Sequence, residues 1–375
     1  MESVLRNTMP SLLRCVPIAK LACLRGVCAT WKQGIEHFLR FDLKEFDLGW
    51  QVDCVGFDSD DLPGEDGEQF VANLIDFINK QCRSLRIIYL QDWMSASLMH
   101  KFQHTMSHAI ILYFFVIDGV WQHSEIFSQW VSTDWRSLQS LSMTFGTDDL
   151  PFCFGDWFHT IAESLHHLKH LNVEFDFNEK SIDDVGVGTL KSVGAACLRK
   201  VVQIPSLESF GFNGVLPDMV TTDEVQAPLK CLSFGVGDIG NENDCLVVEA
   251  CLIRFLPRLS NLQYLKLTQL PLEVGTLHVL LENVNNITIL KIQACYNISE
   301  LMVRLAEIAA DGTLRWLPRL RQLHFCDITK PIALESMTPL LQARPQLNIP
   351  DDDIFSDFDD NNSVVDMVES KAKVD

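Results

Sequence analysis

The stretch Cys82–Leu90, CRSLRIIYL, carries a spacing that returns along most of the chain. Its apolar residues Leu85, Ile88 and Leu90 occupy the first, fourth and sixth positions of a short pattern. In a strand the fourth and sixth side chains point to the same face, because side chains alternate. The first residue anchors the start of the unit. The stretch therefore predicts a short strand with one buried face.

Eight further copies follow, with starts separated by 27, 26, 30, 39, 22, 33, 25 and 33 residues. They are Leu112–Ile117, Leu138–Met143, Leu168–Val173, Leu207–Phe212, Leu229–Phe234, Leu262–Leu267, Ile287–Ile292 and Leu320–Phe325. Helix-like stretches precede some of the copies, such as 68–80 before the first and 245–256 before the seventh, where apolar residues recur every three or four positions. A period slightly above 29 residues indicates stacked strand–helix units.

This sequence pattern and its period resemble the leucine-rich repeat over residues 82–349, with a final partial unit at Pro345–Ile349. The resemblance implies an α/β solenoid of about nine repeats, with parallel strands on the concave face and helices on the convex face. It divides the chain into a helical segment (1–40), a connector and cap (41–81), the repeats (82–349) and an acidic tail (350–375). The alternative is a coincidence of leucines in another α/β fold.

The N-terminal segment differs in charge from the rest of the chain. Residues 1–40 carry six Arg or Lys against two Glu, whereas the whole chain has a formal net charge of -20. Pro17 can open a helix, and the apolar residues from Leu21 to Ile35 recur at steps of three and four. A preceding short helix would include Met9, Leu12 and Leu13. Helices covering only forty residues need a surface on which to pack.

Val16-Pro17, Leu21, Leu24 and the run Val27-Cys28-Ala-Thr-Trp31 resemble the second half of an F-box. The upstream half departs from that pattern, with Val4-Leu5 where the family usually has Leu-Pro. The resemblance implies docking on the Skp-type adaptor of a cullin-RING ubiquitin ligase. The expected adaptor-binding residues are Leu12, Leu13, Val16, Pro17, Leu21, Leu24, Val27, Cys28, Trp31 and Ile35.

An F-box followed by leucine-rich repeats implies a substrate receptor of the ligase, in which other subunits perform the chemistry. The alternative is a stand-alone leucine-rich-repeat interaction module whose N-terminal helices only cap the first repeat, since solenoids need capped ends.

The second and fifth positions of the repeats are expected to point outward along the concave face. Together with the third and seventh positions they carry six basic residues against Asp118, Glu174 and Glu208. This positive balance favours an acidic or phosphorylated protein substrate, although exposed Lys and Arg are as often only solubilising. The expected substrate-binding residues are Arg86, Tyr89, Lys169, His170, Lys230, Tyr264, Lys266, Lys291, Arg321 and His324.

The acidic composition argues against nucleic acid as a partner, because phosphate neutralisation needs clustered cations. The longest uncharged apolar run, residues 109–117, is about half of what a membrane span needs. Charged residues interrupt any apolar region of a secretory signal, so an intracellular protein, cytoplasmic or nuclear, is expected. The twelve cysteines are then thiols, mostly in the core.

The residues also predict a chain without catalytic chemistry. The sequence has no glycine-rich phosphate loop, nucleophile elbow or Cys-x-x-Cys pair. His100, His104 and His108 recur on one helical face, but solvated histidines are the favoured interpretation, so no metal and no cofactor is expected. The tail after Pro350 carries nine acids against two lysines, which indicates either a solvated tail or a pseudo-substrate for the basic face.

Overall fold

A computed structural model describes the chain as two compact units, Met1–Val185 (unit 1) and Gly186–Asp375 (unit 2). The described residues are 11–54, 65–90, 97–98, 100–102, 107–116, 131–132, 135–146, 154–176, 187–214, 226–235, 255–270, 286–293, 318–326, 338, 340–342 and 344–349.

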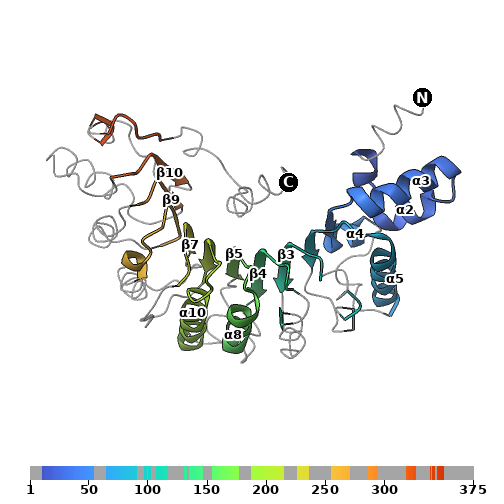
Figure 1. The fold of residues 1–375 in the computed structure, drawn as a ribbon, viewed down its shortest axis with the longest axis horizontal. Coiled ribbons are helices and arrows are strands. Elements are labelled where there is room, and N and C mark those ends of the chain that lie inside the picture. The colour runs from blue at the N-terminus through green and yellow to red at the C-terminus, as the bar shows by residue number, and fades with distance from the viewer. Residues whose placement is uncertain are drawn as a thin grey trace. The chain divides into compact units, whose positions relative to one another are not determined.

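Within its described residues, unit 1 forms a run of parallel strands (Figure 1). They are β1 (Glu45–Asp47), β2 (Ile87–Leu90), β3 (Ile111–Val116), β4 (Ser140–Gly146) and β5 (His170–Asp176). Each strand pairs with the next along the chain. Parallel neighbours need a crossover connection, and helices α5 (Glu65–Gln81) and α8 (Phe154–Ser164) lie in two of the crossovers. Figure 1 shows α8 on one side of β4 and β5.

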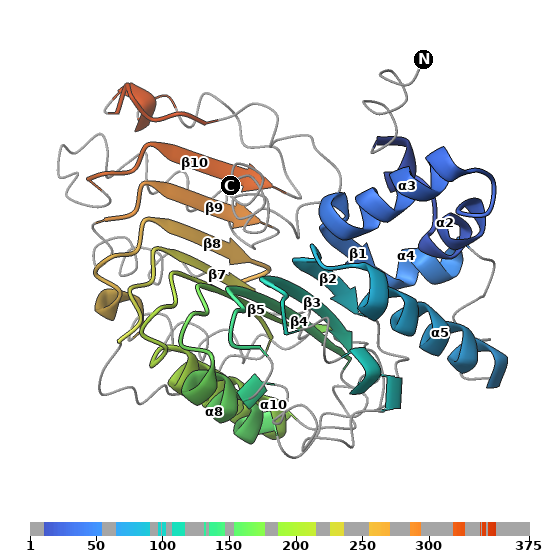
Figure 2. The same ribbon diagram turned by 45° about the vertical axis from the view of Figure 1, so that its right-hand side comes forward.

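Short helices precede and follow the first strand of unit 1. They are α2 (Ile18–Leu24), α3 (Ala29–His37), the π-helix η1 (Phe38–Asp42) and α4 (Leu48–Asp53). Figure 2 shows α2, α3 and α4 grouped together, with α5 beside β2. Asp47 caps α4, since its carboxylate accepts a hydrogen bond from the Trp50 N–H at 3.0 Å.

Unit 2 repeats the same arrangement. Within its described residues, helix α10 (Val187–Val201) precedes a run of parallel strands, and the 3-10 helix η4 (Leu256–Arg258) lies before the strand Tyr264–Thr268. The strands are β6 (Ser209–Asn213), β7 (Cys231–Gly235), β8 (Tyr264–Thr268), β9 (Ile289–Gln293) and β10 (Gln322–Cys326), again paired in chain order. Beyond β10, Asn348 forms an isolated parallel bridge with Gln322.

Most positions of the repeat pattern lie in the core of the two units. Leu85, Ile88 and Leu90 are buried in unit 1, and the matching Leu262, Leu265 and Leu267 are buried in unit 2. The second-position carbonyl of one repeat accepts two N–H groups from the next repeat. The Gln139 carbonyl, for example, accepts from Lys169 N at 2.8 Å and His170 N at 3.0 Å. Each unit is therefore an α/β leucine-rich-repeat solenoid.

Two details differ from the sequence prediction. Leu112 pairs with Ile88 and Leu141, so it holds the fourth position of its repeat and not the first, and Ala109 is the buried anchor. Every residue from Ala109 to Ile117 is apolar, and alternation cannot set the register of such a run. The predicted connector also contains a strand, β1, which pairs with β2 around the buried Phe46.

Candidate functional site

The N-terminal helices are fixed to the repeats by polar contacts. The buried amide of Gln51 in α4 accepts a hydrogen bond from the Ile18 N–H at 2.7 Å, which satisfies the first turn of α2. Arg25, just after α2, pairs with Glu36 of α3 at 2.6 Å, and its guanidinium lies 6.0 Å from the ring centroid of Phe77 in α5. These contacts hold α2 and α3 against α4 and α5.

The predicted apolar stripe is divided between two helices. The chain leaves α2 after Leu24, turns through Gly26, and re-enters a helix at Ala29 with Cys28 as the N-cap residue in extended conformation. Helical periodicity does not extend across such a turn. The residues on either side therefore point in different directions.

Part of the predicted adaptor-binding set serves the protein's own core. Leu13, Pro17, Leu21 and Ile35 are all buried. Ile18, Phe38 and Leu39 in the same helices are buried as well. The four predicted side chains are therefore not accessible to a partner in this structure.

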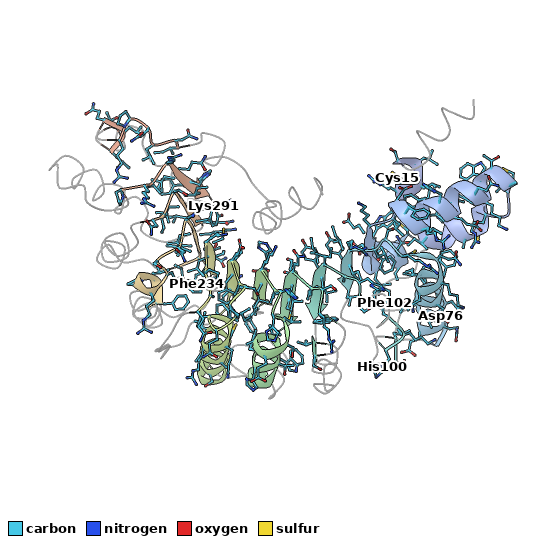
Figure 3. The ribbon with its side chains drawn as sticks, viewed as in Figure 1. Cys15, Asp76, His100, Phe102, Phe234 and Lys291 are labelled. Carbon is cyan, nitrogen blue, oxygen red and sulfur yellow. The ribbon has the colours of Figure 1, made fainter. Side chains whose placement is uncertain are left out.

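The remaining part of the set is accessible. Leu12 is 53% exposed, Val27 is 64% exposed and Cys28 is exposed, while Val16, Leu24 and Trp31 are half-buried. We call Leu12, Val27 and Cys28 the exposed set. Sequence reasoning missed two exposed neighbours, Cys15 and Cys23; Figure 3 labels Cys15 on the N-terminal helices. Large apolar side chains left in water at one end of a folded domain are typical of a binding surface.

We expect Gln51→Ala to destabilise unit 1 by about 1–3 kcal/mol, because the buried Ile18 N–H would lose its acceptor. Thermal unfolding followed by circular dichroism measures the change. Gln69→Ala is the matched control, since Gln69 is exposed and bonds only locally to Asn73. A change below 0.5 kcal/mol for Gln51→Ala, within the range of ordinary surface substitutions, would contradict the proposed anchoring.

On the face of the sheet opposite the core, the fifth positions of unit 1 form an aromatic and polar row. Tyr89 and Tyr113 are register neighbours, and their rings stack with centroids 4.4 Å apart at an interplanar angle of 3°. Further along the row, the Asn172 amide donates to the Ser142 hydroxyl at 3.3 Å. Among the predicted residues, His170 of β5 lies on the same face at the third position. Stacked tyrosines are frequent energetic centres of protein interfaces.

The same row in unit 2 is cationic. Lys266 of β8 and Lys291 of β9 are direct register neighbours, and His324 of β10 follows Lys291. The two lysines are only 7% and 6% exposed, and Tyr264, also predicted, is buried beside them at the third position. Figure 3 labels Lys291 on β9. Both lysines also make contacts within the protein. Their ammonium groups bring positive charge to this face, the sign that pairs with carboxylates or phosphates.

The other four predicted residues lie elsewhere. Arg86, Lys169, Lys230 and Arg321 precede their strands, at the edge where the strands start. One of them, Lys230, pairs with Glu208 of the preceding repeat at 2.7 Å. The predicted substrate-binding set therefore occupies two surfaces, six residues on the sheet face and four on the starting edge. Asp118, counted with the face in the sequence, lies outside the described residues.

The reactivity of the cysteine thiols tests which of them are buried and which are exposed. Burial raises the pKa of Cys82 to about 12 and that of Cys197 well above its ordinary value. At pH 8 only about one part in ten thousand of Cys82 would be thiolate, the reactive form. We expect iodoacetamide to label the exposed Cys15, Cys23 and Cys28 at least a hundredfold faster than Cys82 and Cys197, as read by mass spectrometry of the native protein. Comparable rates would contradict the described burial.

Within the described part of the chain, no helix has the length and apolar character to cross a membrane.

Comparisons with known proteins identify no family for this chain. No family model matches the chain, and no curated protein matches it. A leucine-rich-repeat-containing protein from Legionella pneumophila, LegL7, is 13% identical with a TM-score of 0.45, and the match covers 84% of each chain. A chain of the yeast Rad7–Elc1 complex is 15% identical with a TM-score of 0.44, covering 93% of this chain and 91% of that one. Because both TM-scores are below 0.5, the leucine-rich-repeat assignment rests on the strand pairing and buried positions described above.

Proposed function

We propose that the chain is a non-catalytic substrate receptor of a Skp-cullin-F-box type ubiquitin ligase, acting in ubiquitin-dependent protein degradation. The N-terminal helices would dock the Skp-type adaptor, and the repeats would hold a protein substrate. The observation that carries the proposal is the exposed set, of which Val27 and Cys28 lie within the F-box-like motif. These side chains stay exposed although the rest of the segment is packed against the protein. The receptor's contribution to catalysis would be a raised effective concentration of substrate.

The two parts of the helical segment support one another in this role. The buried part fixes α2 and α3 to the repeats, so a bound adaptor would be held rigidly relative to the substrate-binding face of unit 1. Lys20 and Lys32 are exposed on the same helices and would favour an acidic adaptor surface.

For the substrate, the proposed contact surfaces are the Tyr89–Tyr113 stack in unit 1 and the Lys266–Lys291–His324 row in unit 2. The second row favours an acidic or phosphorylated protein. The alternative remains a stand-alone leucine-rich-repeat interaction module, and the buried part of the helical segment is the observation that favours it. Adaptor binding separates the two functions.

We expect purified Skp-type adaptor to bind the intact chain and Val27→Asp to weaken that binding at least tenfold, because a carboxylate would be buried in an apolar contact. Isothermal titration calorimetry gives both affinities. Phe41→Asp is the matched control: Phe41 is 54% exposed in η1 but lies outside the F-box-like spelling, and its substitution should change affinity less than twofold. If the intact, folded chain fails to bind, the cap-only alternative is correct.

A further inference from the structure

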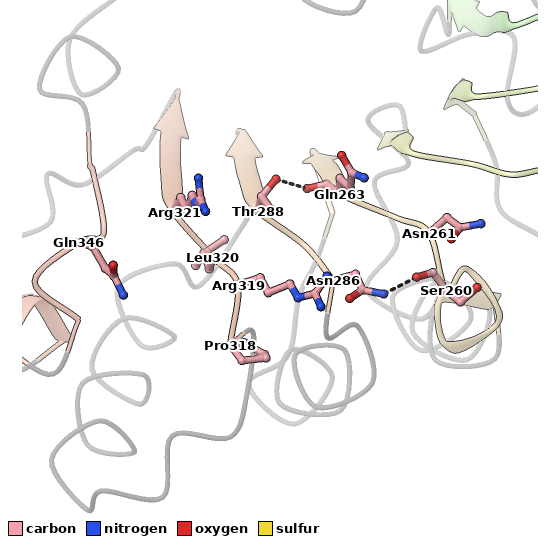
Figure 4. Close-up of a pocket in the computed structure, with 10 residues that line it drawn as sticks. All are labelled: Ser260, Asn261, Gln263, Asn286, Thr288, Pro318, Arg319, Leu320, Arg321 and Gln346. Carbon is pink, nitrogen blue, oxygen red and sulfur yellow. Dashed lines mark hydrogen bonds between the residues drawn. The ribbon is translucent and has the colours of Figure 1, made fainter.

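A polar hollow of about 640 Å³ lies in unit 2 at the edge where β8, β9 and β10 start. Figure 4 shows its lining residues on successive strand starts and on the turns before them. They are Ser260, Asn261, Gln263, Asn286, Thr288, Pro318, Arg319, Leu320, Arg321 and Gln346. Of these, only Arg321 belongs to the substrate-binding residues that the sequence suggested.

The backbone around the hollow is already satisfied by the fold. The Gln263 carbonyl accepts the N–H groups of Thr288 and Ile289 at 2.8 and 3.1 Å, and the Thr288 carbonyl accepts those of Arg321 and Gln322. The Thr288 hydroxyl donates to the Gln263 carbonyl at 3.1 Å, and the Asn286 amide donates to the Ser260 carbonyl (Figure 4). These bonds fix the wall and leave other side chains available to a ligand.

The available side chains are donors. The guanidinium groups of Arg319 and Arg321 form no hydrogen bond or ion pair with any described residue, and both residues are exposed. The amides of Asn261, Gln263 and Gln346 are exposed around them. Each guanidinium offers five N–H donors in a planar fork, which matches the oxygens of a carboxylate or phosphate.

The surrounding charge favours an anion. None of the described lining residues is acidic, and within the described part of unit 2 the one acid, Glu208, is paired with Lys230. A nucleic acid is a poor candidate, because the whole chain has a net charge of -20 and would repel a polyanion over longer distances. Three neighbouring strand starts span about 10 Å, which corresponds to about three residues of an extended peptide.

We propose that this hollow binds an anionic peptide segment, whose phosphoryl groups or closely spaced carboxylates are held by Arg319 and Arg321. The amides of Asn261, Gln263 and Gln346 would supply further donors to the oxygens and to the peptide backbone. This site lies apart from the sheet face and does not depend on adaptor docking, so it would stand even if the chain had no role in a ligase.

The test measures fluorescence anisotropy of labelled peptides with the full chain at 150 mM salt. Three probes share one short Gly/Ser sequence: a form with two phosphoserines, a form with Asp at both positions, and the unmodified form. We expect the first or second to bind and the unmodified one not to. Which charged form binds more tightly distinguishes phosphoryl from carboxylate recognition.

The double substitution Arg319→Gln/Arg321→Gln should weaken peptide binding at least tenfold without changing the melting temperature, since both side chains are exposed. Arg199→Gln/Lys200→Gln on α10 is the matched control, because it removes the same two charges from unit 2 away from the hollow; it should change binding less than twofold. Absence of binding by the charged probes, equal losses for both variants, or tighter binding of a single-stranded oligonucleotide at the same two arginines would each overturn the proposal.

Discussion

Replacing Trp157 by Ala is expected to lower the free energy of unfolding by about 3–5 kcal/mol. Trp157 is 1% exposed and lies on α8, the helix between β4 and β5. Truncation removes a large apolar surface from the core and leaves a cavity that the close-packed repeat cannot fill. Guanidinium denaturation followed by circular dichroism measures the loss.

His159→Ala provides the control on the same helix. His159 is 47% exposed at its side chain and pairs only with Glu163 one turn later, at 3.0 Å, so its loss should cost less than about 0.5 kcal/mol. If Trp157→Ala were as mild as His159→Ala, α8 would not cover the core of unit 1.

A second pair of substitutions separates capping from docking in the N-terminal helices. Leu21 is fully buried, so Leu21→Ala should destabilise the protein by about 2–4 kcal/mol. Val27 is 64% exposed, so Val27→Ala should leave the melting temperature unchanged but weaken adaptor binding severalfold. Melting curves and adaptor titrations on both variants give the comparison.

We expect the loss of stability only for Leu21→Ala and the loss of adaptor affinity only for Val27→Ala. The opposite result would contradict this division. If Leu21→Ala weakened adaptor binding well below its melting temperature and Val27→Ala did not, the contact surface would lie on the other side of the helices.

Most of the repeat architecture could be predicted from the sequence, because most of the strands carry their own buried first, fourth and sixth residues. The strand β1 carries the same pattern, Leu43, Phe46 and Leu48, but this copy lies 42 residues before the next. That distance is well above the repeat period, so the sequence alone predicts a connector there. The register predicted for the second repeat is wrong for a different reason. Its apolar run is continuous, so no alternation of apolar and polar residues indicates which side chains face the core.

The candidate site could be predicted only in part. The motif in residues 16–31 indicates a helical binding segment, but it does not predict that Leu21 is buried and Val27 is exposed. That division depends on the turn at Gly26 and on the contacts of Gln51 and Arg25 with residues distant in the sequence. The burial of Lys266 and Lys291 is likewise a tertiary effect, since exposed lysines are the ordinary expectation for strand positions facing away from the core.

The docking claim is tested most directly by thiol labelling with and without saturating Skp-type adaptor. Cys28 belongs to the exposed set, Cys23 lies near the end of α2, and the buried Cys82 and Cys197 serve as unreactive internal references. We predict that bound adaptor slows labelling of Cys23 and Cys28 at least tenfold while leaving the partly exposed Cys54 unchanged. Equal labelling of Cys23 and Cys28 in the presence and absence of adaptor would contradict docking through these helices.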